Sequence, residues 1–382
     1  MGAHHHRRAP ADGSRLHLTA VLTVVAPLAL LTVVALVWLW PPSSAVERAE
    51  GAAQELTGQV TEVLPEPCPE GTPDDVDRCG EVRVELDEGD EVTAPLPGGL
   101  GAPEVEVGHD VVLIRSETPD GVSYDVVDHQ REVGLWLLGL AFVLALVAFG
   151  RWRGVTALLG LAATFGILAV FVVPAILAGS PPLLVAVVAS AAVVLVVLYL
   201  THGLALTTTM AVLGTLTSLA LTGVLSAVAV SGLHLTGVTD DLSASVGTSH
   251  GIDVRGLLLA GIIIGSLGVL DDVTVSQAAT VAELARADPS SGFRGLFRAG
   301  SRVGRAHVAS VVNTIVLAYA GASLPLLVLI VADNGSLTAV VPSQVVAQEI
   351  VRSAVATIGL VAAVPITTAL TAWALRNREP AG

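Results

Sequence analysis

The stretch from Gly256 to Glu283 most constrains the fold, because it is apolar enough to enter a membrane and also contains carboxylates. Its apolar first part, Gly256 to Leu270, would rise only about 22 Å as a helix, less than the roughly 30 Å hydrocarbon core of a bilayer. A spanning helix must therefore continue through Asp271 and Asp272. The sequence predicts at least one carboxylate within the bilayer or at its edge.

Small and polar residues recur along this helix at spacings of three and four. They form one stripe: Gly261, Gly265, Gly268, Asp272, Ser276, Ala279 and Glu283. Residues at these spacings share one helical face. A face of this kind predicts contact with other helices rather than with lipid.

The composition is that of a polytopic membrane protein. Of the 382 residues 53% are hydrophobic and only 14% charged, and the mean hydropathy is +0.74. The net charge of -15 is concentrated between Pro41 and Glu132, which contain 23 acidic and 5 basic residues. Nucleic acid requires a basic binding surface, so nucleic acid is not an expected partner.

The chain begins with a basic, Pro-bearing and Gly-bearing segment, residues 1–17, which we interpret as a disordered cytoplasmic tail. The apolar run 18–40 follows and ends in two tryptophans and a Pro-Pro pair. It is longer than the apolar region of a signal peptide, and we interpret it as an uncleaved transmembrane anchor.

Residues 41–131 form the one sizeable polar segment, and we expect them to lie outside the cell. Residues 45–56 read as a short polar helix. Alternating or β-branched stretches with turn residues between them then predict strands. The five strands are Gly58–Val63, Glu81–Leu86, Glu91–Ala94, Val111–Arg115 and Val122–Val127. Five short strands favour a small β-rich domain, with an OB-like barrel as the candidate fold.

Both cysteines, Cys68 and Cys79, lie in this external segment. We expect a disulfide between them, worth roughly 2 to 3 kcal/mol to the domain. A metal or redox role is less favoured because the spacing is not CxxC.

Residues 132–375 form a seven-helix transmembrane core, with a cytoplasmic tail at 376–382. The expected helices cover 133–150, 154–178, 181–200, 205–231, 256–283, 306–332 and 351–375. With the anchor they make about eight spans. Alternate threading places the arginine-rich short loops inside, in agreement with the positive-inside rule, and both termini in the cytoplasm. Residues 343–350 read as a surface helix or as an extension of the last span.

The intramembrane carboxylates are the first candidates for a cation or proton site, because an ionisable group on a lipid-facing helix costs at least about 2.5 kcal/mol. Asp272 shares the small-residue stripe and is the better candidate, ahead of Asp271. Ser276 and Gln277 lie nearby as oxygen ligands, and Glu283 lies about 16 Å further along the same face. The alternative is a pair of interfacial aspartates that bond neighbouring helices.

Asn313 and Thr314 lie in the middle of the next apolar run. Lipid cannot satisfy an amide, so these side chains are expected to face protein or water. They either complete the site with Asp272 or form hydrogen bonds between helices.

A second, weaker group of candidates lies in the acidic external loop 232–254. Histidines and aspartates suited to a transition metal occur there without tight spacing: His234, Asp240, Asp241, His250 and Asp253. No cofactor is predicted apart from a possible bound cation.

Three long blocks carry a family resemblance. They are GIIIGSLGVLDDVTVSQAATVAEL, GSRVGRAHVASVVNTIVLAYAGASLPLLVL and SQVVAQEIVRSAVATIGLVAAVPITTAL. From about Arg131 to Leu375 the chain resembles the YibE/F-like family of bacterial membrane proteins. The resemblance implies a multi-pass, permease-like protein of the bacterial cytoplasmic membrane and no catalytic residue.

Two functions are open at this stage. The first is a secondary transporter or permease for a cation, proton or small solute, with Asp272 at its centre. The alternative is a membrane-anchored sensor or scaffold whose acidic external domain binds an envelope protein. No hydrolase or metalloprotease motif occurs, so an enzyme is not expected. Close helix contact through Gly261-x-x-x-Gly265 also permits a homo-oligomer.

Overall fold

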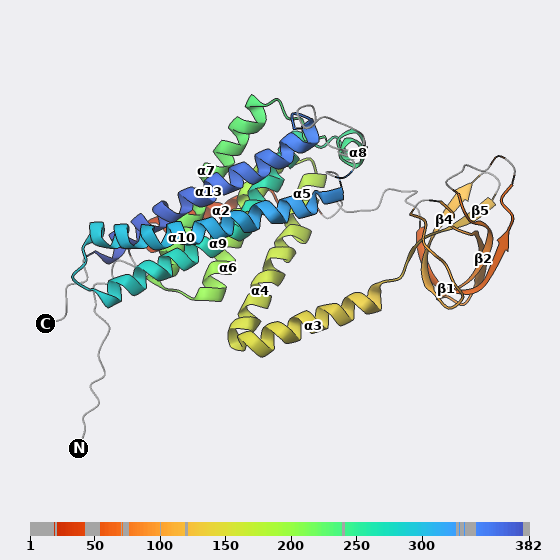
Figure 1. Ribbon diagram of the computed structural model, residues 1–382, viewed down its shortest axis with the longest axis horizontal. Helices are drawn as coiled ribbons and strands as arrows, with labels where there is room; N and C mark the ends of the chain where they lie inside the picture. Colours follow the sequence, from red (N-terminus) through yellow and green to blue (C-terminus); the bar gives the residue numbers. More distant parts are fainter. Residues whose placement is uncertain are drawn as a thin grey trace, which may run out of the picture. The chain divides into compact units, whose positions relative to one another are not determined.

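The computed structural model describes residues 19, 21–42, 54–69, 71, 76–99, 101–118, 121–238, 241–325, 328, 332 and 341–376. The chain divides into two compact units (Figure 1). One is a helical unit, Met1–Val46 with Trp152–Gly382, and the other is Glu47–Arg151. The predicted tails at 1–17 and 377–382 lie outside the described residues.

The second unit contains a five-stranded antiparallel sheet of strand order β3-β2-β1-β4-β5. Its strands are β1 (Gln54–Glu66), β2 (Cys79–Leu86), β3 (Glu91–Pro95), β4 (Asp110–Thr118) and β5 (Gly121–His129). All five predicted strands are confirmed, and most are longer than predicted. The expected helix over 45–56 is wrong at its end, because residues 54–56 pair with β4 as the first part of β1.

Alternation places one side of each strand in a valine-rich core. In β2, Val82 and Val84 are fully buried, while Glu81, Arg83 and Glu85 are exposed. The edge strands β3 and β5 also contact one another, so the sheet curls round this core. This alternation of buried and exposed side chains is expected for a strand with one face in the core and one face in solvent.

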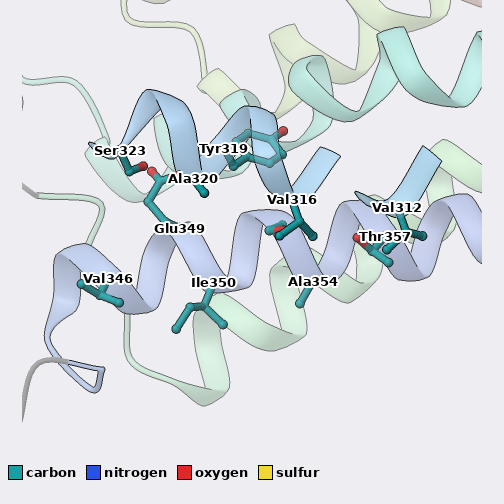
Figure 2. Close-up of a pocket in the computed structure, with 11 residues that line it drawn as sticks. Val312, Val316, Tyr319, Ala320, Ser323, Val346, Glu349, Ile350, Ala354 and Thr357 are labelled. Carbon is teal, nitrogen blue, oxygen red and sulfur yellow. The ribbon is translucent and has the colours of Figure 1, made fainter. Parts of the chain in front are cut away.

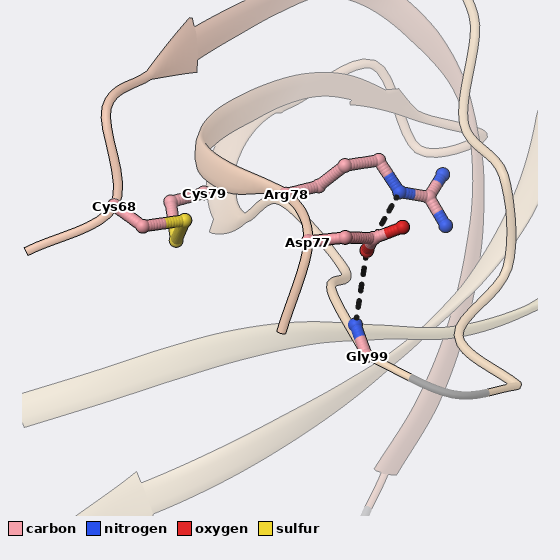
Figure 3. Close-up of polar contacts among 5 residues, drawn as sticks. All are labelled: Cys68, Asp77, Arg78, Cys79 and Gly99. Carbon is pink, nitrogen blue, oxygen red and sulfur yellow. Dashed lines mark hydrogen bonds and ion pairs between the residues drawn. A yellow bond between two sulfur atoms is a disulfide. The ribbon is translucent and has the colours of Figure 1, made fainter. Parts of the chain in front are cut away.

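The predicted disulfide is confirmed. Cys68 and Cys79 are joined, with their Cα atoms 5.1 Å apart (Figure 3). Beside it, Asp77 accepts hydrogen bonds from the Gly99 amide and from Arg78 Nε, each at 3.4 Å. The Gly99 bond is the main reason that the pKa of Asp77 lies below its usual value. These contacts hold the segment before β2 against the loop after β3.

Seven helices within the described ranges are long and apolar enough to cross a membrane. They are α3 (Glu132–Gly150), Trp152–Leu177, α6 (Pro182–His202), α7 (Leu206–Gly232), α9 (Val254–Ala287), α10 (Phe293–Ala322) and α13 (Gln344–Leu375). The apolar helix of the anchor is shorter, Thr23–Trp38. The chain is therefore mostly helical, and an eighth span is not confirmed.

Proline shapes the second of these helices. It consists of α4 (Trp152–Ile167), the π-turn η3 (Leu168–Val172) and α5 (Val173–Leu177). Pro174 is the second residue of α5, just beyond the π-turn, as expected where a missing N–H breaks the regular ladder. Residues 344–350 continue into α13 without a break, so the extension that we considered for them is the correct alternative.

The α7, α9 and α13 helices pack closely because small and hydroxyl residues meet at their contacts. A Cβ on Gly214 would lie 2.2 Å from Thr367 Oγ1, and one on Gly359 would lie 2.0 Å from Thr222 Oγ1. Thr215 and Thr274 hydroxyls are 2.6 Å apart across α7 and α9. The contacts among α7, α9 and α13 at the centre of the helical unit are thus closely packed, and the cavities lie beside them.

Candidate functional site

The predicted aspartates lie in a polar cavity of about 680 Å³ between α4, α6 and α9. Asp271 and Asp272 enter from α9, which continues as one helix through both residues as the sequence predicts. The polar side chains that surround them are Arg153 and Thr156 of α4 and Thr201 and His202 of α6. The site is thus assembled from three helices that are distant in sequence.

Helix ends supply two of these groups. Arg153 stands in the first turn of α4, and His202 is the last residue of α6. The α6 helix stops there because Gly203 adopts a φ of 75°, which favours glycine. Thr201 Oγ1 lies 2.7 Å from His202 Nδ1, and this contact fixes both side chains at the cavity.

The charges in this cavity favour a cation. Two carboxylates face one guanidinium, which leaves one net negative charge when His202 is neutral. Neither aspartate forms an ion pair with any residue within the described ranges. Carboxylate and hydroxyl oxygens are the ligands that hard cations prefer.

A smaller cavity of about 210 Å³ lies along the same three helices and is also lined by Asp271. Ser190 of α6 faces it and is only 1% exposed. Its hydroxyl has no hydrogen-bond partner in the described part of the chain. A buried hydroxyl of this kind costs free energy unless a water or a ligand pairs with it. Asp271 therefore lies where a polar cavity meets a narrower one.

The structure corrects the expected packing of α9. Other helices leave most of the small-residue stripe uncovered, since Gly261, Gly268 and Asp272 on it are exposed. Large residues instead occupy the contacts, among them Ile263 and Leu270, which are about 1% exposed. Asp271, which lies off the stripe, is more buried than Asp272 and lines both cavities.

Gln277 lies apart from the aspartates in the structure. It is buried, and its Nε2 donates to Gly300 O at 2.9 Å and to Thr368 Oγ1 at 2.7 Å. The amide therefore holds α9, α10 and α13 together. Its predicted role as a ligand beside Asp272 is not supported by this geometry.

Ser276 and Glu283 also have other contacts. Ser276 Oγ donates to the Val273 carbonyl at 3.1 Å, within α9. Glu283 is exposed and forms an ion pair with Arg286 one turn further on. Neither lines the cavity at the aspartates.

Asn313 and Thr314 lie on the exposed face of α10, which packs through Gly304 and Ile315 on its other side. Thr314 Oγ1 donates to Ser310 O at 3.2 Å within its own helix. The structure therefore does not bring these two residues together with Asp272.

The described part of the structure does not bring the weak metal candidates together. No group of three or more His, Cys, Asp or Glu residues suited to a metal occurs in the part of the chain that is described. Asp240 and the side chains of Asp241 and His250 lie outside the described residues. His234 lies two residues after α7, with a φ of 54°, and Asp253 precedes α9. Asp241–His250 forms a short helix, α8, where we expected only a loop.

Sequence reasoning missed Arg153, Thr156 and Ser190. No spacing rule connects them to Asp271, because they stand on other helices. A usable signal was the arginine at the start of an apolar run, since a guanidinium there can reach an intramembrane carboxylate.

Comparison with known proteins gives one finding. The sequence model of the family described as YibE/F-like protein matches residues 138–377, from within α3 to the end of α13. No curated protein and no solved structure matches the chain. The match covers more than half of the sequence and includes every residue of both cavities beside Asp271. The chain belongs to the YibE/F-like family.

Proposed function

We propose that this protein is a permease that moves a small cation or a proton across a membrane through the cavities beside Asp271. One observation carries the proposal: Asp271 lines both the wide polar cavity and the narrow one. A carboxylate in this position can take a cation from the first space and release it into the second. The proposal makes the protein a transporter rather than an enzyme, with no cofactor.

The groups around Asp271 have separate roles in this proposal. Asp272 and the hydroxyls of Thr156 and Thr201 complete the oxygen ligands in the wide cavity. Arg153 competes with the cation for the carboxylates and thereby keeps its affinity low enough for release. Ser190 supplies the next oxygen on the narrow side. Carboxylates within membrane-spanning helices, with hydroxyl neighbours, are typical of ion and proton pathways in membrane proteins.

The proposed setting is the bacterial cytoplasmic membrane. We propose eight spans with both termini in the cytoplasm, with 18–40 as the anchor and the β-rich unit outside. The distribution of arginines supports this orientation. The strand order β3-β2-β1-β4-β5, with contact between β3 and β5, supports an OB-like barrel for that unit.

The test is cation uptake into proteoliposomes that contain the whole chain. Sodium, potassium, magnesium and manganese are compared, each with and without a pH gradient. We expect Asp271→Asn to abolish uptake of the transported ion and Asp272→Asn to reduce it. Glu283→Gln, which removes a carboxylate of the same helix outside the cavities, is the matched control and should transport normally.

Binding separates a transport defect from a folding defect. A cation at one hundred times its dissociation constant should stabilise the wild type by about 2.7 kcal/mol and leave folded Asp271→Asn unchanged. Normal uptake by Asp271→Asn would refute the proposed site.

A second candidate function is favoured by the external acidic surface. Glu85 of β2 and Glu91 of β3 are direct partners in the antiparallel register. Like charges opposite one another destabilise a sheet, and a bound basic group removes the repulsion. The β-rich unit would then recognise a basic envelope protein, and the protein would act as a sensor or scaffold. Loss of partner binding in Glu85→Gln/Glu91→Gln, with unchanged uptake, would favour this function.

A further inference from the structure

A separate cavity of about 440 Å³ lies between α10 and α13 (Figure 2). None of its lining residues belongs to the site beside Asp271. Its walls are mostly aliphatic: Val312, Val316, Ala320, Val346, Ile350 and Ala354. Cavities of this size and apolar character are the usual sites of small organic ligands in proteins.

Glu349 is the one charged side chain in that lining. Figure 2 shows it reaching from α13 toward α10, near Ser323. Its Oε1 forms an ion pair with Arg352 Nη1 at 3.0 Å, and Arg352 itself does not line the cavity. Oε2 of Glu349 has no partner among the residues that the structure describes. One carboxylate oxygen thus remains available to a ligand.

Two further groups limit what the ligand can be. Tyr319 contributes an aromatic ring, whose face attracts cations. Thr357 Oγ1 is buried without a hydrogen-bond partner in the described residues. A bare metal ion prefers several charged oxygen ligands at once, and these mostly aliphatic walls bring a single carboxylate. A large cation with an apolar body matches both the walls and the single carboxylate.

We propose that the cavity between α10 and α13 binds a lipophilic organic cation. The apolar body of the ligand lies between the valine and isoleucine side chains, and its charge faces Glu349 and the ring of Tyr319. This site does not depend on transport through Asp271. The Tyr319 hydroxyl reaches Gly265 of α9, so Tyr319 forms the wall of the cavity on that side.

The test compares two probes of the same shape and opposite charge, tetraphenylphosphonium and tetraphenylborate. Equilibrium binding of each is measured on the whole chain, purified in a neutral detergent. We expect the phosphonium to bind at least about tenfold more tightly than the borate, because its charge is opposite to that of Glu349. Equal affinities would show an apolar groove filled by lipid or detergent and would overturn the proposal.

Variants assign the preference to Glu349. The double variant Glu349→Gln/Arg352→Gln removes the ion pair without leaving an unpaired charge, and it should bind both probes equally. Arg352→Gln alone keeps the carboxylate and should strengthen phosphonium binding. Asp271→Asn, in the other cavity, should bind both probes as the wild type does. A preference that persists in the double variant would also overturn the proposal, because Glu349 would then not be its source.

Discussion

The cavity beside Asp271 and the cavity beside Glu349 lie in the same helical unit, and their linings differ in kind. The first combines two carboxylates, a guanidinium and several hydroxyls. The second sets one carboxylate against aliphatic walls and an aromatic ring. Small hydrated cations suit the first lining, and large apolar cations suit the second. The second carboxylate and the guanidinium of the first cavity, compared with the aliphatic walls of the second, therefore separate the two linings.

The difference has its origin in how the helices pack. The α10 helix contacts α9 and α13 through Gly300 and Gly304, so its backbone lies close to both. The α4 helix instead contacts α6, and the exposed stripe of α9 lies beside this pair. The polar cavity lies between α4, α6 and α9, and Gly265 and Gly268 of the α9 stripe line the smaller cavity. The apolar cavity lies beside a tight contact.

The largest effect should come from the glycine that holds α10 in place. A Cβ on Gly304 would lie 2.4 Å from Val364 Cγ1 and 2.7 Å from Gln277 Oε1. We expect Gly304→Ala to lower the free energy of unfolding by about 1 to 3 kcal/mol, because the added methyl group overpacks this contact. It should also weaken phosphonium binding and leave cation binding at Asp271 intact.

Gly268→Ala is the matched control for that variant. Gly268 lines the smaller cavity beside Asp271, and a Cβ there meets no atom within 4 Å. The substitution should change stability by less than about 1 kcal/mol. Thermal unfolding of both variants in the same detergent checks the pair, and equal melting temperatures would contradict the packing argument.

Sequence patterns predicted the helices and strands better than the faces they present. Strong alternation defines β2, where Val82 and Val84 are buried, and long apolar runs define the seven apolar helices. The short helix α8 was missed because its sequence, DLSASVGTSH, has no apolar periodicity. The disulfide was predictable because only two cysteines exist.

The candidate site was only half predictable. Asp271 and Asp272 are evident because a helix must continue through them to span a bilayer. Their neighbours Arg153 and Thr201 come from other helices, and helix packing cannot be read from a single sequence. The stripe on α9 was expected to contact other helices, whereas most of it is exposed. Glycine suits an open cavity wall as well as a tight helix contact, so the pattern alone does not decide between them.

A smaller effect is expected where the two cavities approach one another. The Tyr319 hydroxyl lies 3.2 Å from the position of a Cβ on Gly265, which lines the smaller cavity. Gly265→Ala should displace the phenol by a few tenths of an ångström, and this strain should offset part of the roughly 0.5 to 1 kcal/mol that alanine gains over glycine in a helix. Tyr319→Phe removes the hydroxyl, so the same substitution should be more favourable in that background. A double-mutant cycle measures this coupling, and strictly additive effects would show that the two residues do not interact.

The smallest effect should arise at the turn between α9 and α10, which belongs to neither cavity. Asp288 accepts hydrogen bonds from Ser290 Oγ at 2.6 Å, from Ser291 Oγ at 2.7 Å and from the Ser290 amide at 3.1 Å. These bonds, the Ser290 hydroxyl first, hold the pKa of Asp288 below its usual value. A carboxyl group whose pKa is lower in the folded state stabilises that state above its unfolded pKa, about 3.9. The contribution is lost as the pH falls through the lower folded pKa.

The wild type should therefore melt at a slightly higher temperature than Asp288→Asn between pH 5 and 7, and the difference should shrink below about pH 4. In a Ser290→Ala/Ser291→Ala background, which lacks both hydroxyl donors, the same substitution should have less effect at every pH. A difference between wild type and Asp288→Asn that grows on acidification would contradict the assignment.

Because the turn connects a helix of the polar cavity to a helix of the apolar one, loosening it should weaken both kinds of ligand binding alike. A loss of ligand binding at only one cavity would show that the turn positions only the helix of that cavity, α9 or α10.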